Sequence, residues 1–159
     1  SNSSAASDVY KRQALQGAEV LFVPHASPGP ETARQKRDRW LRYLAARAYD
    51  NSAYLVACNP VDNGPGRLNF PGLAVILSPR GELLAEHTGD SQAVLVADLS
   101  GGELAKVRSS QMGFFLAGRR PELYSALARR SQRHNTGYNS CVNRSGTARA
   151  VHGTTVATS

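Results

Sequence analysis

The sequence predicts a mixed α/β fold built in layers. Short apolar runs bounded by glycine, proline or asparagine, which suit buried strands, surround one long segment whose apolar residues recur at helical spacing. The chain has 159 residues, 41% of them hydrophobic, which is enough for one domain-sized core. Continuous apolar strands combined with helices are typical of sheets that are covered on both faces.

The expected elements follow in chain order. A first strand covers residues 18–23, because an apolar run there is opened by Gly17 and stopped by Pro24. A turn-rich loop over residues 25–30 leads to a helix over about residues 31–50, on whose apolar face Trp40 is expected to lie in the core. Similar patterns predict strands at residues 53–58, 73–77, 82–87 and 93–99, with a hairpin turn at 78–81, and a second helix at about 102–109.

The two ends of the chain differ in composition from the middle. Residues 1–13 begin with a Ser/Ala/Asn string, and the following DVYKRQ resembles the translation of a sequencing adapter, so a non-native or disordered leader is expected. Residues 125–159 consist mostly of Arg, Ser, Thr, Asn and Gly without an apolar period, which predicts a basic disordered or out-of-frame tail. Residues 14–124 are the expected ordered part.

The charge of the chain is concentrated in the ends. The formal net charge is +7, of which the five arginines after residue 124 contribute +5 and residues 1–12 contribute +1. The middle is nearly neutral, so whole-chain charge says little about its ligand. No apolar run approaches the roughly eighteen residues that span a bilayer, and the first residues lack the apolar core of a secretory signal. We therefore expect a cytoplasmic protein without membrane association.

The chain has two cysteines, Cys58 and Cys141. They lie far apart, so the sequence shows neither a disulfide framework nor a metal-ligand spacing. Cys58 falls inside an apolar strand, where a thiol is expected to be a small, buried and inert side chain.

Six segments, in order, resemble the C-terminal half of the nitrilase superfamily of carbon–nitrogen hydrolases: GAEVLFVPHAS, ARAYDN, AYLVACN, NFPGLAVILSPRGELLAE, VLVADL and RRPELY. The resemblance implies a four-layer α-β-β-α sandwich, of which this chain would hold an incomplete part. It also implies hydrolysis of a non-peptide carbon–nitrogen bond in a small-molecule amide, carbamoyl compound or nitrile. No metal or organic cofactor is expected. Members of the family commonly associate through their C-terminal region, so the resemblance also implies a homo-oligomer.

The resemblance also implies which catalytic groups to look for. Members of the family use a glutamate base, a lysine and a cysteine nucleophile, with the cysteine in a motif shortly before the GAEV strand. The corresponding stretch here reads DVYKRQALQ, and the first cysteine of this chain is Cys58. No residue of this chain is therefore assigned a catalytic role, and we expect the chain alone to be inactive.

Five residues are candidates for substrate contact by resemblance. His25, Ala26 and Ser27 follow the first strand, where loops of this sandwich line the pocket, and Asn69 and Phe70 belong to a segment that borders it. The alternative for the first three is an ordinary turn whose polar groups meet water or backbone. The alternative for the last two is a strand entry bent by proline and glycine.

Two other function classes remain open from the sequence. The first is a small basic protein that binds nucleic acid through its arginine-rich tail, although no recognised reading motif is present. The second is a non-catalytic assembly protein that uses exposed sheet faces and edges to associate.

Overall fold

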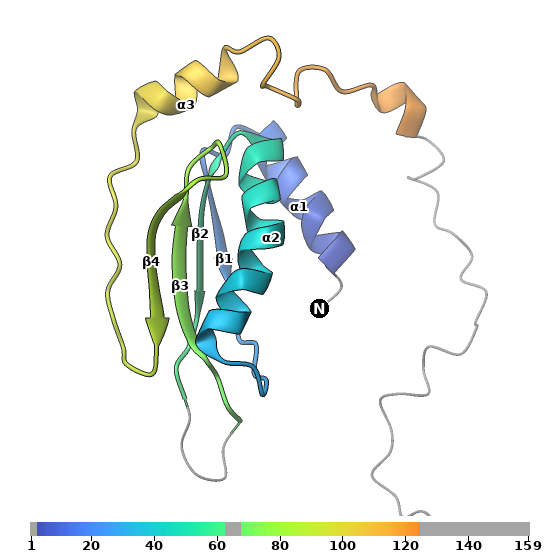
Figure 1. The fold of residues 1–159 in the computed structure, drawn as a ribbon. Helices are drawn as coiled ribbons and strands as arrows, with labels where there is room; N and C mark the ends of the chain where they lie inside the picture. The colour runs from blue at the N-terminus through green and yellow to red at the C-terminus, as the bar shows by residue number, and fades with distance from the viewer. Residues whose placement is uncertain (1–2, 63–67, 125–159) are drawn as a thin grey trace, which may run out of the picture. The chain divides into compact units, whose positions relative to one another are not determined.

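The computed structural model describes residues 3–62 and 68–124 (Figure 1). The chain divides into two compact units, residues 1–119 and 120–159. The described part of the second unit includes a short 3-10 helix, Pro121–Tyr124, next to an ion pair of 2.8 Å between Arg120 and Glu122. The first unit contains α1 (Ser3–Leu15), β1 (Val20–Pro24), α2 (Ala33–Asn51), β2 (Tyr54–Asn59), β3 (Gly72–Leu77), β4 (Leu83–Gly89) and α3 (Gly101–Arg108).

The four strands form one mixed sheet in the order β1-β2-β3-β4. β1 and β2 run parallel and are connected through α2, whereas β2–β3 and β3–β4 are antiparallel pairs. In the β3–β4 turn Gly81 has a φ of 78°, and a Cβ atom there would lie 2.8 Å from the carbonyl oxygen of Ala45. The predicted hairpin is confirmed, and its turn requires glycine for both backbone conformation and close approach to α2.

α2 has clear start and stop signals. Thr32 and Gln35 form a reciprocal capping box at its beginning. At its end Ser52 adopts a left-handed conformation (φ 45°), and its N–H bonds back to the last turn. The predicted helix at residues 31–50 is thus confirmed, with its first residue two positions later. Four buried side chains at intervals of four residues share one face of this helix: Lys36, Trp40, Leu44 and Ala48.

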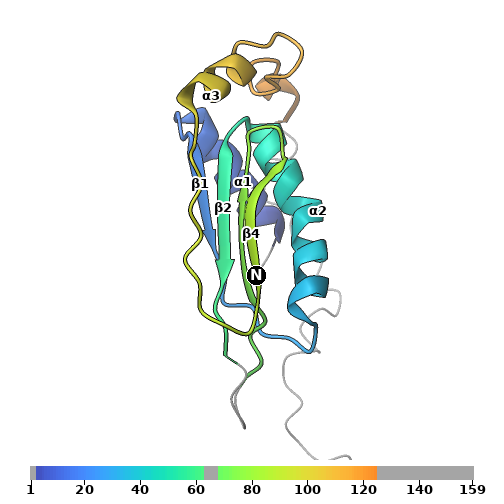
Figure 2. The same ribbon diagram turned by 60° about the vertical axis from the view of Figure 1, so that its left-hand side comes forward.

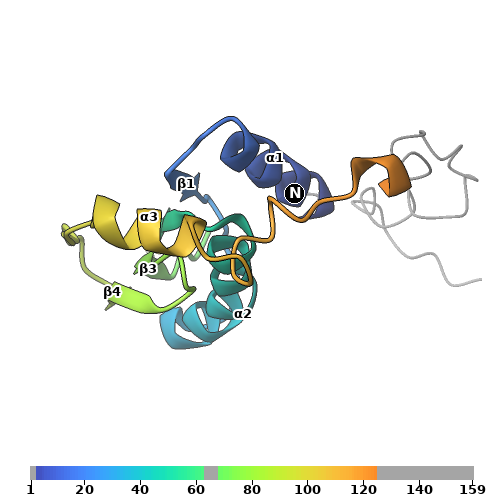
Figure 3. The ribbon, with the colours of Figure 1, turned by 90° about the horizontal axis from the view of Figure 1, so that it is seen from above.

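The hydrophobic core lies between α2 and one face of the sheet. Trp40 is 1% exposed, as the sequence predicted, and packs with inward-facing side chains of β1, β2 and β3. Tyr10 of α1 packs against the edge of this core. Figure 3 shows both helices on the same side of the sheet, which gives this unit two layers. The core members are Leu21, Val23, Trp40, Leu44, Ala48, Ala53, Leu55, Ala57, Leu73, Val75 and Leu77.

No helix of the described residues covers the opposite face of the sheet, which we call the open face. Because strand side chains alternate between faces, the residues between the core positions point there. Phe22 is 72% exposed and Val56 is only partly buried. Cys58 is also exposed. The prediction that Cys58 is buried is therefore wrong, because the alternation of β2 directs this thiol away from α2.

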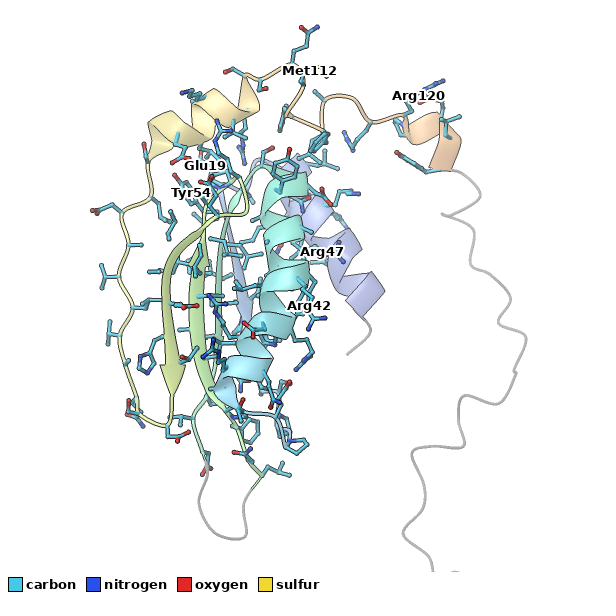
Figure 4. The ribbon with its side chains drawn as sticks, viewed as in Figure 1. Glu19, Arg42, Arg47, Tyr54, Met112 and Arg120 are labelled. Atoms are coloured by element: carbon cyan, nitrogen blue, oxygen red, sulfur yellow. The ribbon has the colours of Figure 1, made fainter. Side chains whose placement is uncertain are left out.

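Residues 93–99 do not form the predicted fifth strand. They are extended but pair with no strand in the described part of the chain, and Val94 and Val96 are 91% and 81% exposed. Figure 2 shows the segment running along the open face, on the side of the sheet away from α2. It leads to Ser100, whose carbonyl accepts a 2.9 Å hydrogen bond from the Tyr54 hydroxyl, and Figure 4 shows Tyr54 near the start of α3. The predicted fifth strand at residues 93–99 is therefore wrong, because an apolar run forms a strand only when a neighbouring strand is available.

α3 lies at one end of the sheet (Figure 1). The predicted helix at 102–109 is confirmed as α3, and Arg108 donates to the carbonyls of Ser52 (3.0 Å) and Ala18 (2.6 Å). The sequence predicted no ordered element over residues 1–13, yet α1 occupies most of them, with Ala14 in its last turn buried. Among the described residues, no helix combines the length and apolar character needed to cross a bilayer.

Candidate functional site

The candidate site lies at the carboxyl ends of β1 and β2. Because these strands are parallel, the loop after β1 and the residues after β2 meet at one edge of the sheet, a usual place for ligands in α/β folds. His25, Ala26 and Ser27 lie in this loop, which we call the 25–31 loop. The backbone N–H of His25 donates to the carbonyl of Cys58 at 2.8 Å and so ties the start of the loop to β2.

The segment before β3 also reaches the 25–31 loop. The amide side chain of Asn69 donates to the carbonyl of Gly29 at 2.7 Å, and the Gly29 N–H donates to the carbonyl of Asn69 at 2.9 Å. Phe70 is half-buried and forms an isolated antiparallel bridge with Asp62. The structure therefore places the 25–31 loop beside the segment that contains Asn69 and Phe70, although these two segments are 40 residues apart at the Gly29–Asn69 contact.

Two buried side chains that sequence reasoning missed hold Ser27. The ammonium of Lys36 donates to the Ser27 carbonyl (2.5 Å) and to its hydroxyl (3.2 Å). The Asn59 side chain accepts from the Ser27 N–H (2.9 Å) and donates to the Ser27 carbonyl (3.2 Å) and the Pro71 carbonyl (2.9 Å). We call Ser27, Glu31, Lys36 and Asn59 the Ser27 network. Lys36 could have been suspected from the sequence, because a lysine there continues the four-residue spacing of the buried face of α2.

Glu31 neutralises the buried ammonium. Its carboxylate lies 3.1 Å from the Nζ of Lys36 and 2.5 Å from the guanidinium of Arg39. The hydrogen bonds from Arg39 lower the pKa of Glu31, and the Lys36 ammonium lowers it further against the opposing effect of burial. Glu31 is therefore a carboxylate at neutral pH, and Lys36 keeps a paired negative charge although its side chain is fully buried.

His25 packs on the core rather than standing free in solvent. Its ring centroid is 4.2 Å from that of Trp40, and its Nδ1 is 2.9 Å from the carbonyl oxygen of Val23. A carbonyl can only accept, so Nδ1 carries the proton in this bond and Nε2 of the neutral ring is an acceptor. Burial lowers the pKa of His25, and the nearby charges of Lys36 and Arg39 lower it as well, while the bond to Val23 opposes them.

Cys58 and His87 lie apart from this loop chemistry, on the open face. They line one shallow hollow with Ala74 and Ser91. Cys58 pairs across the sheet with Ala74, which pairs with His87, so two strand spacings, about 10 Å, separate the two positions. The direct proton transfer that an activated thiol needs occurs over about 3 Å. Within residues 3–62 and 68–124, no group of three His, Cys, Asp or Glu side chains is arranged to hold a metal ion.

Two arginines of α2 reach other elements of the first unit, Arg37 and Arg39, whereas Arg42 contacts its own helix. Arg37 forms an ion pair with Glu86 of β4 at 2.6 Å, and Arg42 donates to the backbone carbonyl of Asp38 at 3.2 Å. Figure 4 shows Arg42 and Arg47 along α2. Arg39 contacts the 25–31 loop through Glu31, whereas the ion pair of Arg37 links the surface of α2 to β4.

Comparison with known proteins identifies the family. The family model for carbon–nitrogen hydrolases matches residues 7–109. An N-carbamoylputrescine amidase from Arabidopsis thaliana is 37% identical over 122 residues, which are 71% of this chain and 40% of that enzyme. The chain therefore spans well under half the length of this curated relative.

Two solved structures have the same fold. A carbon–nitrogen hydrolase from Helicobacter pylori G27 superposes with a TM-score of 0.66 at 24% identity, covering 78% of this chain and 45% of that one. An amidase from Nesterenkonia sp. AN1 has a TM-score of 0.54 at 30% identity, covering 74% of this chain and 38% of that one, and its active-site cysteine carries a covalently added acetamide moiety from fluoroacetamide. On the match over residues 7–109 and the shared fold, this chain belongs to the carbon–nitrogen hydrolase family.

Proposed function

We propose that the chain is part of an amidase-type carbon–nitrogen hydrolase that acts on a small amide or N-carbamoyl compound. The observation that carries the proposal is the family match over residues 7–109. The names of an N-carbamoylputrescine amidase and of a bacterial amidase among the similar proteins support a planar carbonyl or carbamoyl carbon as the reacting centre. Water would replace the nitrogen on that carbon, with release of ammonia or an amine.

We further propose that the nucleophile belongs to polypeptide outside this chain. In the Nesterenkonia amidase the reacting group is a cysteine. Cys58 and His87 line the same hollow, but their backbone positions are two strand spacings, about 10 Å, apart, and among the described residues no hydrogen bond joins the two side chains. The thiol is therefore not paired with that histidine as a base. On this proposal a glutamate, a lysine and a cysteine lie before the region equivalent to residue 14. The chain corresponds to the C-terminal half of the family domain and does not turn over substrate by itself.

The uncovered apolar surface supports this proposal. A four-layer sandwich would place a second sheet against the open face, where Phe22 now has 72% of its surface exposed. The same layer could offer a strand to residues 93–99, whose exposed Val94 and Val96 have the alternation of a strand without a partner. The proposed hydrolase fold begins within the expected leader, because the family match starts at residue 7 and Tyr10 packs against the core. The expected tail, residues 125–159, lies outside the described residues.

In the proposed enzyme, the 25–31 loop together with Asn69 and Phe70 forms one wall of the substrate pocket. Support comes from their placement at the carboxyl ends of β1 and β2 and from the contacts between Gly29 and Asn69. The proposed reaction uses protein groups alone. We propose a cytoplasmic homo-oligomer, in keeping with the sequence expectation.

The inactivity of the isolated chain can be tested by ammonia release. Purified chain would be incubated with N-carbamoylputrescine and with acetamide, beside the Cys58→Ala variant. The proposal predicts no release above a protein-free blank for either form. Turnover by the unmodified chain that is lost in Cys58→Ala would show that Cys58 is the nucleophile and would refute the proposal of an external one.

A non-catalytic assembly role is the second candidate, because the exposed Phe22 and Val96 favour self-association. Light scattering of the purified chain and of a double variant, Phe22→Ser with Val96→Ser, would measure it. Concentration-dependent association that these changes abolish supports assembly through the open face. A monodisperse monomer at all concentrations would remove this candidate and weaken the proposal of a missing layer. The nucleic-acid alternative falls on residues 125–159, outside the described residues.

A further inference from the structure

Among the described residues, Lys36 is the one charged side chain that is fully buried. The proposed chemistry does not use it. Its ammonium has three N–H groups and meets three acceptors: the Ser27 carbonyl at 2.5 Å, the Ser27 hydroxyl at 3.2 Å and the Glu31 carboxylate at 3.1 Å. Burying a charge is costly unless it is paired and hydrogen-bonded, so the position of these acceptors is strongly coupled to that of Lys36.

Ser27 is held from the other side by Asn59, which is 7% exposed. Asn59 uses the N–H and the carbonyl of Ser27, and the same carbonyl accepts from Lys36. The backbone donor of Ser27 is therefore occupied, and its carbonyl already accepts from two donors. A carbonyl oxygen has two lone pairs, so Ser27 has no free backbone capacity for a ligand.

His25 differs from Ser27 in this respect. Its Nδ1 is bound to the Val23 carbonyl and its ring rests on Trp40, so the ring is fixed while Nε2 remains an acceptor. Ala26 is exposed and lies between these two fixed residues. The 25–31 loop is thus fixed at His25 and Ser27, and these two residues together determine the position of Ala26.

We propose that Lys36 is a positioning residue: its buried ammonium fixes Ser27 so that His25, through Nε2, and Ala26 meet the N–H groups of an amide or ureido ligand. This inference rests on the proposed function and refines it, because it removes the backbone of Ser27 from the direct ligand contacts. It also assigns a role to a residue on α2 that touches no ligand itself.

The test compares two identical chemical changes at different places. Lys36→Met removes the buried ammonium and keeps an unbranched side chain, whereas Lys106→Met removes an exposed ammonium from α3. Amide hydrogen exchange measured by NMR would report Ser27, with Leu55 in β2 as a monitor of global opening. A hydrogen bond to a charged group contributes about 1.5–3 kcal/mol, so Ser27 should exchange at least about 10-fold faster in Lys36→Met relative to Leu55. Lys106→Met should leave this ratio unchanged.

A spectroscopic signature separates positioning from simple packing. In Lys36→Met the pKa of His25, followed through its ring signals, should rise because a nearby positive charge is gone. Adding N-carbamoylputrescine at millimolar concentration should shift the 15N signal of His25 Nε2 in the unmodified chain and in Lys106→Met. The affinity obtained from this titration should be about 10-fold lower in Lys36→Met. Weak binding at this concentration is expected without further polypeptide, because the proposed contacts, His25 and Ala26, and the Ser27 network that positions them all lie within this chain.

Each outcome decides a different statement. Unchanged Ser27 exchange in a folded Lys36→Met protein would overturn the role of Lys36, whatever the chain binds. A ligand shift confined to Ser27, with Nε2 of His25 unmoved, would overturn the assignment of contacts. Loss of Ser27 protection in Lys36→Met with no ligand shift in the unmodified chain would leave Lys36 as an anchor of the loop and would contradict its proposed ligand role. If Lys36→Met does not fold, Glu31→Gln tests the same network, because it weakens the pairing of the ammonium without opening the core.

Discussion

Replacing Asn59 with alanine should destabilise the protein far more than the same replacement at Asn69. Asn59 is 7% exposed and its side chain forms hydrogen bonds with the Ser27 N–H (2.9 Å) and the Pro71 carbonyl (2.9 Å). The Ser27 carbonyl keeps its bond from Lys36 and is not orphaned. Two polar groups therefore lose their partner, at about 1–3 kcal/mol each when water cannot replace it.

The expected loss for Asn59→Ala is about 2–4 kcal/mol, towards the lower end because water can reach the half-buried Ser27. Asn69→Ala removes one side-chain bond, to Gly29 at 2.7 Å, on an exposed side chain, and should cost less than about 1 kcal/mol. Urea unfolding followed by far-UV circular dichroism would measure both, with a midpoint shift of roughly 1–2 M for Asn59→Ala. Equal losses for the two variants, or an Asn59→Ala protein as stable as the parent, would refute this reasoning.

Two other changes test the fold and its pH dependence. Gly81→Ala should lower the free energy of unfolding by about 1–3 kcal/mol, because φ is 78° and the new Cβ would approach the Ala45 carbonyl oxygen. Gly101→Ala is the control, because a Cβ there meets no atom within 4 Å, and it should be neutral or slightly stabilising. Thermal or urea unfolding measures both. Burial lowers the pKa of His25, so the unfolded chain binds a proton more readily than the folded chain. The free energy of unfolding should therefore be highest above pH 6.5, the ordinary pKa of histidine, and should fall as the pH drops below that value. His25→Gln should flatten this part of the profile and His87→Gln should not; a profile unchanged by His25→Gln would contradict the stated cause.

Much of the fold could be predicted because local patterns and tertiary packing agree. The run 18–23, the hairpin at 78–81 and the helix with Trp40 on its apolar face all correspond to elements of the structure within one or two residues. Residues 93–99 show the limit of this approach. Their short apolar run is typical of a buried strand, but hydrogen bonding to a neighbouring strand is a tertiary property that a single segment does not encode. α1 was missed for the opposite reason, since its composition lacks a continuous apolar stripe and, over residues 9–15, Ala14 is the one buried side chain.

The candidate site was predictable in position but not in detail. The resemblance placed His25, Ala26 and Ser27 after β1, and the parallel arrangement of β1 and β2 brings that loop to Asn59. Nothing in a one-dimensional pattern identifies Asn59 as the partner of Ser27, because that contact joins residues 32 positions apart. The exposure of Cys58 was likewise not predictable, because it depends on whether another layer covers the open face.

The sequence of the genomic DNA on the 5′ side of the region that encodes residue 14 tests the central claim most directly. The account predicts an uninterrupted reading frame in which codons for glutamate, lysine and cysteine occur in family order, with the cysteine shortly before the strand that begins at Val20. A native frame that opens directly into the serine-rich leader, and whose purified product hydrolyses N-carbamoylputrescine, would contradict it.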